Sequence, residues 1–512
     1  MYQAINVRGD KDMFLDYAMQ DRAIRIIQEG GKPLTNERFI EHEIRRVKQS
    51  KEWKWMLTGD DYYRGRHDIL KKTRTAIGDD GNLVEVKNLP NAKLVDNVYK
   101  RMVKQKTNYL LGKPFIVNAD DDLYTEALTW FFDKAFMRKL KSVGKDCLNC
   151  GIGWLYCYYD EQGEFQFKRF RPFEIIPEWK DVDHTQLDSV IRFYEVDWFD
   201  GERDTKITKV EHYTAQGIDY YQMDRTDGHI VAVEPFHQPY MMFDGVGYNW
   251  DKLPFIPFKY NDEEQPLIVN CKSLQDGLNT ILSNFDDQMN EDSRNTILVL
   301  VNYDGENLGE FRRNLATYGA VKIRSAEGAS GDVRTLQVEV NSENYKAISD
   351  IFKRAIIENC MGYDAKDERL GGSPNQMNIQ SMYNDIDLDA SDMETEFQAA
   401  FDDLLYFVDL HLQNAGQGDY TTVEARITFN TSMPMDKSSV IQNAQNSTGI
   451  ISKRTITAHH PWVTDLDAEL EQLAEEEAEE QQKLEAQYNP FGVGGTNPAE
   501  GNEPPEGDGD AE

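Results

Sequence analysis

The sequence predicts a helix-rich α+β fold made of several parts, and three observations lead to this prediction. Apolar residues recur every three or four positions over long stretches, which is typical of amphipathic helices. Residues 151–261 instead alternate aromatic or β-branched side chains with polar ones, and turn residues interrupt them, which indicates an antiparallel sheet. A length of 512 residues, at roughly 100–200 per domain, suggests about three folding units.

The chain is strongly acidic, with 56 Lys and Arg against 90 Asp and Glu and a formal net charge of -34. Tight binding along a nucleic-acid backbone needs clustered Lys and Arg, so this composition excludes it. We expect no membrane-spanning segment, because every apolar run is far shorter than about 20 residues. The N-terminus also lacks the apolar core of a secretory signal.

The first part of the chain predicts two helices and then the sheet. After an N-terminal arm, residues 1–35, a helical period begins near Asn36, and the polar aromatic stretch DYYRGRHDIL follows at 61–70. A second helix is predicted for 91–111, where a Gly-Lys-Pro sequence ends it. The strands then run as far as LPFIPF, 253–258, whose two prolines exclude a central strand.

Residues 266–361 predict a stalk of two helices, 266–293 and 341–361, with a small α/β head, 294–340, inserted at the tip. The first helix carries a sustained apolar stripe, and the second carries another. Two helices alone cannot bury both stripes if their flanks are also apolar, so lateral neighbours are expected. The residues expected to pack in such an oligomer are Leu267, Leu274, Leu278, Ile281, Phe285, Ile348, Phe352 and Ile356.

Inside the head, the sequence predicts strands at 296–301, 320–323 and 335–340 and a short helix near 308–315. This alternation makes the head a separate small α/β unit.

The C-terminal part predicts a mobile loop followed by one very long helix. Residues 362–378 are rich in Gly, Asp and Asn, whereas 376–412 contain no Gly or Pro and give a helix of roughly 35 residues. A helix of this length favours assembly over a compact monomer. A last strand is predicted at 421–429, followed by a helix at 435–446, a turn with a second helix at 449–465, and a third helix at 466–487.

The end of the chain, residues 488–512, is rich in Gly, Pro and acids. Such a composition cannot bury a core, so this tail is expected to be disordered.

The cysteines and acidic clusters each allow a functional and a structural interpretation. The scattered cysteines do not form a disulfide framework, and Cys147 with Cys150 lacks a second pair for zinc, so buried thiols are favoured. Asp120–Asp122 and Asp286–Asp287 could hold the magnesium ions of a nuclease. Solvated acidic faces are the preferred interpretation in so acidic a chain, and we expect no metal and no cofactor.

An aromatic cluster and two Gly-Lys-Pro sequences each allow a functional interpretation as well. Trp53, Trp55, Tyr62 and Tyr63 could stack on bases, but packing in a core or subunit interface is favoured. No stretch matches a phosphate-binding loop, since both Gly-Lys-Pro sequences lack the hydroxyl residue that binds magnesium. We therefore expect no ATPase activity and no catalytic residues.

Five short motifs occur in an informative order around the stalk: YYRGRHDIL at 62–70, NYLLGKP at 108–114, LPFIPF at 253–258, TGIISKRT at 448–455 and HPWV at 460–463. In these motifs and in their order, the sequence resembles the portal proteins, or head-to-tail connectors, of long-tailed double-stranded DNA bacteriophages. The resemblance spans roughly residues 36–485.

The resemblance implies a division of the chain into named parts. These are a wing (36–265 and 379–435, with a long wing helix and closing strand), a two-helix stem (266–293 and 341–361), an α/β clip (294–340), a tunnel loop (362–378) and a helical crown (436–487).

It also implies a homo-oligomeric ring, usually of twelve subunits, at one vertex of the capsid, assembled in the host cytoplasm. The expected partners are the terminase large subunit, a head-tail adaptor, the major capsid and scaffolding proteins, and double-stranded DNA that passes without specific binding. An acidic wall suits such a channel, because sliding DNA should be repelled rather than held.

In such a ring the tunnel loop should line the narrowest part of the channel. Its mixed charges allow transient phosphate contacts, and its glycines allow movement. The expected channel residues are Asp364, Lys366, Asp367, Glu368, Arg369, Gly371 and Gly372. A metal-dependent nuclease or an acidic assembly scaffold remains the alternative. A ring by mass supports the portal, a monomer that cleaves DNA with magnesium supports the nuclease, and an inert monomer supports the scaffold.

Overall fold

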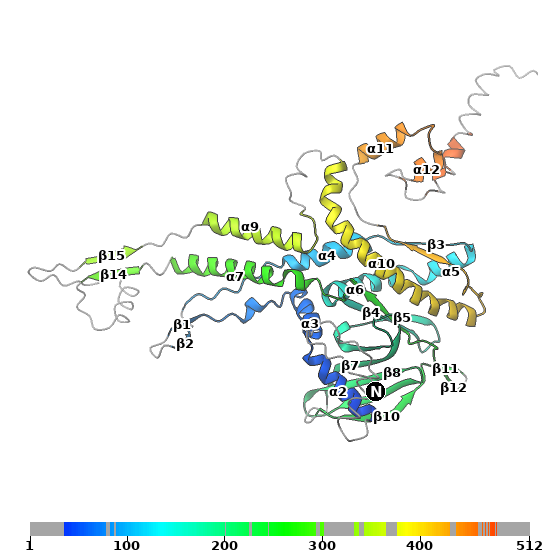
Figure 1. The fold of residues 1–512 in the computed structure, drawn as a ribbon, viewed down its shortest axis with the longest axis horizontal. Coiled ribbons are helices and arrows are strands. Elements are labelled where there is room, and N and C mark those ends of the chain that lie inside the picture. Colours follow the sequence, from blue (N-terminus) through cyan, green and yellow to red (C-terminus); the bar gives the residue numbers. More distant parts are fainter. Residues whose placement is uncertain are drawn as a thin grey trace, which may run out of the picture. The chain divides into compact units, whose positions relative to one another are not determined.

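The computed structural model describes residues 35–77, 82–86, 89–199, 201–224, 228–243, 245–292, 297–301, 332–336, 342–364, 376–430, 437–458, 463, 466, 469–470, 472–476 and 478. The chain divides into two compact units, one of residues 1–367 with 381–433 and one of 368–380 with 434–512 (Figure 1). The N-terminal arm up to residue 34 and the C-terminal tail lie outside the described residues.

Two helices open the first unit, α2 (Asn36–Gln49) and α3 (Lys51–Tyr63). The Thr35 hydroxyl caps α2, and the Ser50 hydroxyl accepts the Trp53 amide at 3.1 Å to start α3. The predicted helix start near Asn36 is confirmed. Residues 51–63, which include the start of the polar aromatic stretch, are helical as well. The short elements that follow are η1 (Asp68–Lys71), β1 (Thr75–Ile77) and β2 (Leu83–Glu85).

Helix α4 (Val98–Leu111) begins seven residues later than predicted, because residues 91–97 are extended. Strand β3 (Ile116–Ala119) and helices α5 (Asp122–Phe131) and α6 (Lys134–Cys150) come next, and neither helix was predicted. Asp121 and Asp133 cap these two helices, each accepting the amide three residues ahead.

The predicted antiparallel sheet region is confirmed, and it forms two main sheets in the described chain. One has the order β13-β4-β5 and the other β10-β9-β8-β7-β6. Pro257 lies in an edge strand, as its missing N–H requires. The elements are β4 (Ile152–Tyr159), β5 (Phe165–Phe170), η2 (Pro172–Glu174), β6 (Ile175–Trp179), β7 (Leu187–Phe199), β8 (Asp204–Thr214), β9 (Gly217–Met223), β10 (Ile230–Gln238), β11 (Met241–Phe243), β12 (Val246–Tyr248) and β13 (Phe255–Lys259).

The two long helices predicted after the sheet are present as α7 (Ile268–Asp292) and α9 (Ser342–Asn359), and they run side by side (Figure 1). Between them in sequence, β14 (Ile297–Val301) and β15 (Asp332–Leu336) pair antiparallel. The strand predicted at 335–340 therefore begins three residues earlier. The strand expected at 320–323 and the helix near 308–315 lie outside the described residues.

The long helix is confirmed as α10 (Gln376–Asn414), with 39 residues. Its apolar side packs in the main core with α4, α6 and β13, and β16 (Ala425–Thr428) pairs with β3. The second unit contains α11 (Lys437–Asn446) and α12 (Lys453–Ala458). Of the helix predicted at 466–487, residues 466, 469–470, 472–476 and 478 are described, and these are helical. Every helix in the described part of the chain is too short or too polar to cross a bilayer.

Candidate functional site

Helices α7 and α9 approach closely because Gly277 has no side chain. A Cβ atom there would lie 2.9 Å from the Phe352 ring. Farther out, the rings of Phe285 and Tyr345 are 4.8 Å apart, and the Tyr345 hydroxyl donates to Gln288 at 2.8 Å. The two helices therefore form a paired stalk within one subunit.

The residues predicted for oligomer packing fall into three groups. Leu267, Leu278 and Ile356 are buried inside the subunit. Leu274, Ile281, Phe285 and Phe352 are half-buried along the stalk. Ile348 is 41% exposed, and Ser349 occupies the buried position beside it. The exposed outer face of α9 also carries Ile351, which the prediction missed.

The opposite side of α7 carries a row of polar side chains that hold an extended backbone. Gln275, Asn279, Ser283 and Asp287 follow one another at steps of four residues and are all buried. They accept the backbone N–H groups of Tyr99, Asp96, Leu94 and Ala92, with N···O distances of 3.1, 3.1, 2.9 and 2.6 Å.

This row is called the polar ladder below, and the described residues 72–77, 82–86 and 89–97, which include strands β1 and β2, are called the strap. The ladder explains why α4 begins late, since the amides of 92, 94 and 96 already have acceptors. Asp287 also pairs with Lys72 at 2.9 Å. A polar residue at every fourth position of a helix was the available sequence signal.

Residues 61–70 bind helix α7 through a second set of polar contacts. The His67 ring stacks on Tyr62, and its Nε2–H donates to the Tyr62 carbonyl at 3.1 Å. Its Nδ1 accepts from the Asn279 amide at 2.8 Å, because the Asn279 oxygen is used by the ladder. This arrangement requires neutral imidazole, and burial lowers the pKa of His67.

An ion-pair cluster beside this motif binds the first turns of α7. Lys272 lies 2.7 Å from both Asp68 and Asp276, and the Tyr62 hydroxyl donates to Asp276. The hydrogen bond from Lys272 is the main cause that lowers the pKa of Asp68 to about 2. The motif therefore attaches the stalk to α3 by directional contacts.

The first residues of the predicted tunnel loop are held by defined contacts, called the root below. Just beyond the end of α9, Met361 has a φ of +48°, and the Gly362 amide donates back to Ile357 at 2.9 Å. Tyr363 exchanges two hydrogen bonds with the Gln105 side chain, and its ring lies 4.2 Å from that of Tyr383 on α10.

A buried charge pair reinforces this root. Lys106 lies 2.6 Å from Asp389, donates to the Met361 carbonyl at 3.2 Å, and shares Asp389 with the Tyr260 hydroxyl. Burial lowers the pKa of Lys106, and Asp389 opposes that shift. Of the expected channel residues, Asp364 is described, whereas Lys366, Asp367, Glu368, Arg369, Gly371 and Gly372 lie outside the described residues.

The chemical interpretations are resolved for several side chains. All five cysteines are buried, as favoured, and burial raises the pKa of Cys147 and Cys150. Among the described residues, no group of three or more His, Cys, Asp or Glu is placed to hold a metal. The solvated interpretation of Asp287 is wrong, since it is 4% exposed and belongs to the ladder, and Asp121 is a helix cap.

The packing interpretation of the aromatic residues is confirmed. Tyr62 is buried, Trp55 and Tyr63 pack against the main core, and the Trp53 indole donates to the Phe173 carbonyl at 3.0 Å. These rings are therefore not displayed for stacking on bases.

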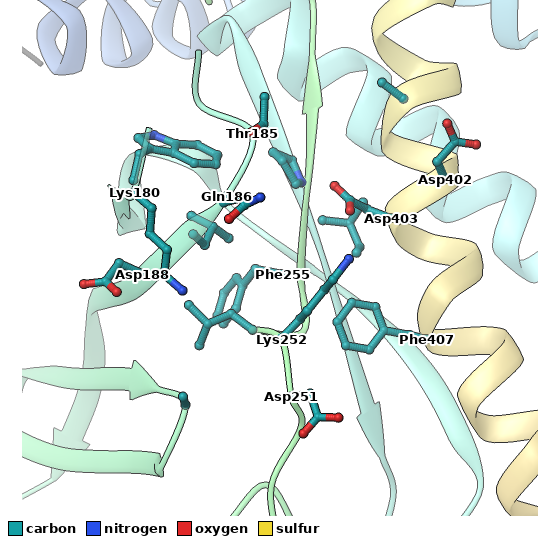
Figure 2. Close-up of a pocket in the computed structure, with 17 residues that line it drawn as sticks. Lys180, Thr185, Gln186, Asp188, Asp251, Lys252, Phe255, Asp402, Asp403 and Phe407 are labelled. Carbon is teal, nitrogen blue, oxygen red and sulfur yellow. The ribbon is translucent and has the colours of Figure 1, made fainter. Parts of the chain in front are cut away.

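A pocket of about 450 Å³ lies between the β6–β7 turn, the segment before β13, and α10. Figure 2 shows the Lys252 ammonium turned toward Asp403, with Phe255 and Phe407 nearby. Burial raises the pKa of Asp403, and Lys252 opposes this. The lining combines charged side chains with apolar ones, so it offers an ionic and apolar contact surface.

Comparisons with known proteins agree with the resemblance seen in the motifs. Residues 40–483 match the family model described as phage portal protein, SPP1 Gp6-like. The chain is 30% identical over 431 residues to the portal protein of Bacillus phage SPP1, covering 82% of this chain and 83% of that protein. It is 28% identical over 448 residues to the portal protein of Clostridium phage phiCD119, covering 85% and 95% respectively.

Among solved structures, a chain from the neck of a native GTA particle computed with C12 symmetry covers 71% of this chain and 89% of its own length. Its sequence identity is 11% and its TM-score 0.35, which is too low to support an argument. The family model and the two relatives are sufficient without it: the chain belongs to the SPP1 Gp6-like family of phage portal proteins.

Proposed function

We propose that this portal protein forms a closed ring at one capsid vertex, through which the phage genome enters and leaves. Portal proteins are structural components of the virion, so the work of moving DNA falls to a separate motor. The observation that carries the proposal is the family match over residues 40–483. The stalk adds physical support, because a single subunit leaves apolar side chains exposed along it.

The parts of the ring follow from the chain order. The wing is 36–265 with 379–435, the stem is α7 and α9, the clip is 294–340, and the crown is 436–487. The clip and crown are the candidate docking surfaces for the terminase large subunit and head-tail adaptor. The wing is the candidate contact with capsid and scaffolding proteins.

The tunnel loop, 362–378, is the proposed constriction of the channel. Its root is supported by the contact between the rings of Tyr363 and Tyr383 and by the buried Lys106–Asp389 pair. A loop with a fixed root can move at its tip without loosening the stem. The net charge of -34 supports a channel that repels and centres DNA.

Native mass spectrometry of the purified full chain tests the ring. The expected result is a single closed assembly with a mass near twelve times 59.1 kDa, with a central hole in electron micrographs. Only monomer and dimer across micromolar concentrations would contradict the proposal. A monomer that cleaves DNA with magnesium would favour the nuclease instead, and an inert monomer would favour the scaffold.

A further inference from the structure

We propose that the strap of each subunit docks on the outer face of α9 of the next copy in the ring. This inference rests on the ring proposed above and goes beyond it, because it assigns two specific surfaces to the lateral contact. Its starting observation is that the strap leaves apolar side chains in solvent. Leu83, Val84 and Leu94 are 72%, 51% and 43% exposed.

The β1–β2 hairpin needs a partner on physical grounds. It is a two-stranded sheet, and all three residues of β2 are exposed. An isolated hairpin is marginally stable in water, so a second surface that covers Leu83 and Val84 would stabilise it. At its base, Lys72 pairs with Asp287 at 2.9 Å and donates to Asn284 at 3.0 Å.

The outer face of α9 presents the complementary surface. Ile351 is 64% exposed and Ile348 is 41% exposed. Ile348 lies on the flank of the face that contacts α7, three residues after Tyr345, and Ile351 lies about 60° farther round the helix. Their exposed apolar side chains match those of Leu83, Val84 and Leu94 on the strap.

The two surfaces lie on opposite sides of the same stalk, as a head-to-tail ring contact requires. Gly277, which faces α9, is two residues after Gln275 of the ladder, and two residues turn a helix by about 200°. Figure 1 shows the same order, with α7 between α9 and the β1–β2 hairpin.

The surfaces also lie at the same level along α7. Leu94 is bonded to Ser283. Ile348 and Ile351 lie between Tyr345, which contacts Phe285, and Phe352, which contacts Gly277. A rotation about the ring axis, which keeps the level unchanged, can therefore bring one surface against the other.

Cysteine cross-linking in the full-length ring tests the contact, and the burial of all five native thiols keeps the background low. In the double variant Leu94→Cys with Ile351→Cys, mild oxidation should move the greater part of the protein into covalent dimers, trimers and higher multimers. A bond within one subunit would leave the protein monomeric in a denaturing gel, so only a bond between subunits gives covalent multimers. Each single variant, and the mismatched pair Leu123→Cys with Ile351→Cys, should remain monomeric in denaturing gels.

Native mass spectrometry of the same reduced samples separates the two possible failures. Rings that form normally but never cross-link would overturn this inference and leave the proposed function standing. A protein that forms no ring at all, wild type included, would overturn both.

A charge placed in the contact gives a second readout. Val84→Asp should raise the concentration at which half of the rings dissociate by about tenfold or more. Val182→Asp is the matched control, since Val182 is 64% exposed on the β6–β7 turn and should have no effect. Equal dissociation of the two variants would contradict the strap contact.

Discussion

Helices α7 and α10 are both long, but they are held by different kinds of contact. One face of α10 packs by apolar burial, with Phe397, Phe401 and Leu404 fully covered in the main core. The strap side of α7 is held by side chains that accept backbone hydrogen bonds, from Gln275 through to Asp287. Apolar burial is roughly proportional to area and has no direction, whereas each hydrogen bond requires one partner at one position.

The difference indicates separate tasks. Apolar packing gives α10 its stability but tolerates small adjustments in the position of the helix. The ladder instead fixes the strap at one register on the stalk, because a shift by one residue would turn the amides away from α7. The stalk surface offered to a neighbour is therefore defined by polar contacts.

The largest expected effect is on the apolar side. Phe401→Ala removes a ring that contacts Phe115, Phe132 and Phe258, and it should lower the free energy of unfolding by about 4 kcal/mol. Urea denaturation monitored by circular dichroism measures this. Leu388→Ala on the exposed side of the same helix is the control and should change stability by less than about 1 kcal/mol. Similar losses in both variants would mean that α10 is not held by its buried face.

The ladder is tested by Asp287→Ala, with an expected loss of about 3 kcal/mol. The substitution leaves the Ala92 amide without its acceptor and removes the ion pair of Lys72, which keeps only its bond to Asn284. Asp286→Ala, one residue away and half-exposed, should cost less than about 0.5 kcal/mol. Hydrogen exchange of the amides at 92, 94 and 96 should accelerate only in Asp287→Ala; unchanged protection there would show that the ladder does not hold the strap.

The smallest expected effect is a pH dependence of stability, which tests the hydrogen bond between Asn279 and His67. Burial lowers the folded-state pKa of His67, so the unfolded chain takes up a proton first as the pH falls below about 6.5. Wild type therefore loses stability on acidification toward the lower folded-state pKa.

His67→Gln has no such group, so its cost of about 1 kcal/mol at pH 7 should shrink by pH 5. The urea midpoints of both proteins from pH 7 to pH 5 measure this. His212 and His411, whose pKa values burial also lowers, are present in both proteins and cancel in the difference. A cost that grows on acidification would mean that His67 is charged in the fold.

Sequence alone predicted what depends on periodicity. The helices α7, α9 and α10, the antiparallel strands and the burial of the cysteines all follow from apolar patterns or residue type. Helices α5 and α6 were missed although Asp121 and Asp133 offered caps. The start of α4 was misplaced because the ladder satisfies its first expected amides.

The stalk illustrates the same limit for the candidate site. Its apolar stripe was visible in the sequence. However, Ile348, which was expected to be buried, is exposed, its neighbour Ser349 is buried instead, and the exposed Ile351 was missed. A stripe on a helix does not say which partner covers each position. The four polar residues of the ladder had a visible spacing, but their partner is a backbone 176 to 195 residues away in sequence, which no local pattern indicates.

The ladder can have only a limited length, because the spacing of amides along an extended chain differs from the spacing of every fourth side chain along a helix. Two residues of extended chain advance about 6.6 Å, whereas four residues of helix advance about 6.0 Å. Each rung therefore adds a misfit of about 0.6 Å, and a hydrogen bond tolerates roughly that much. The N···O distance rises from 2.6 Å at Ala92 to 3.1 Å at Asp96. The strap ends where α4 begins at Val98, so the ladder ends after a few hydrogen bonds. Lengthening α7 by whole helical turns would therefore add polar side chains without backbone amides to bind.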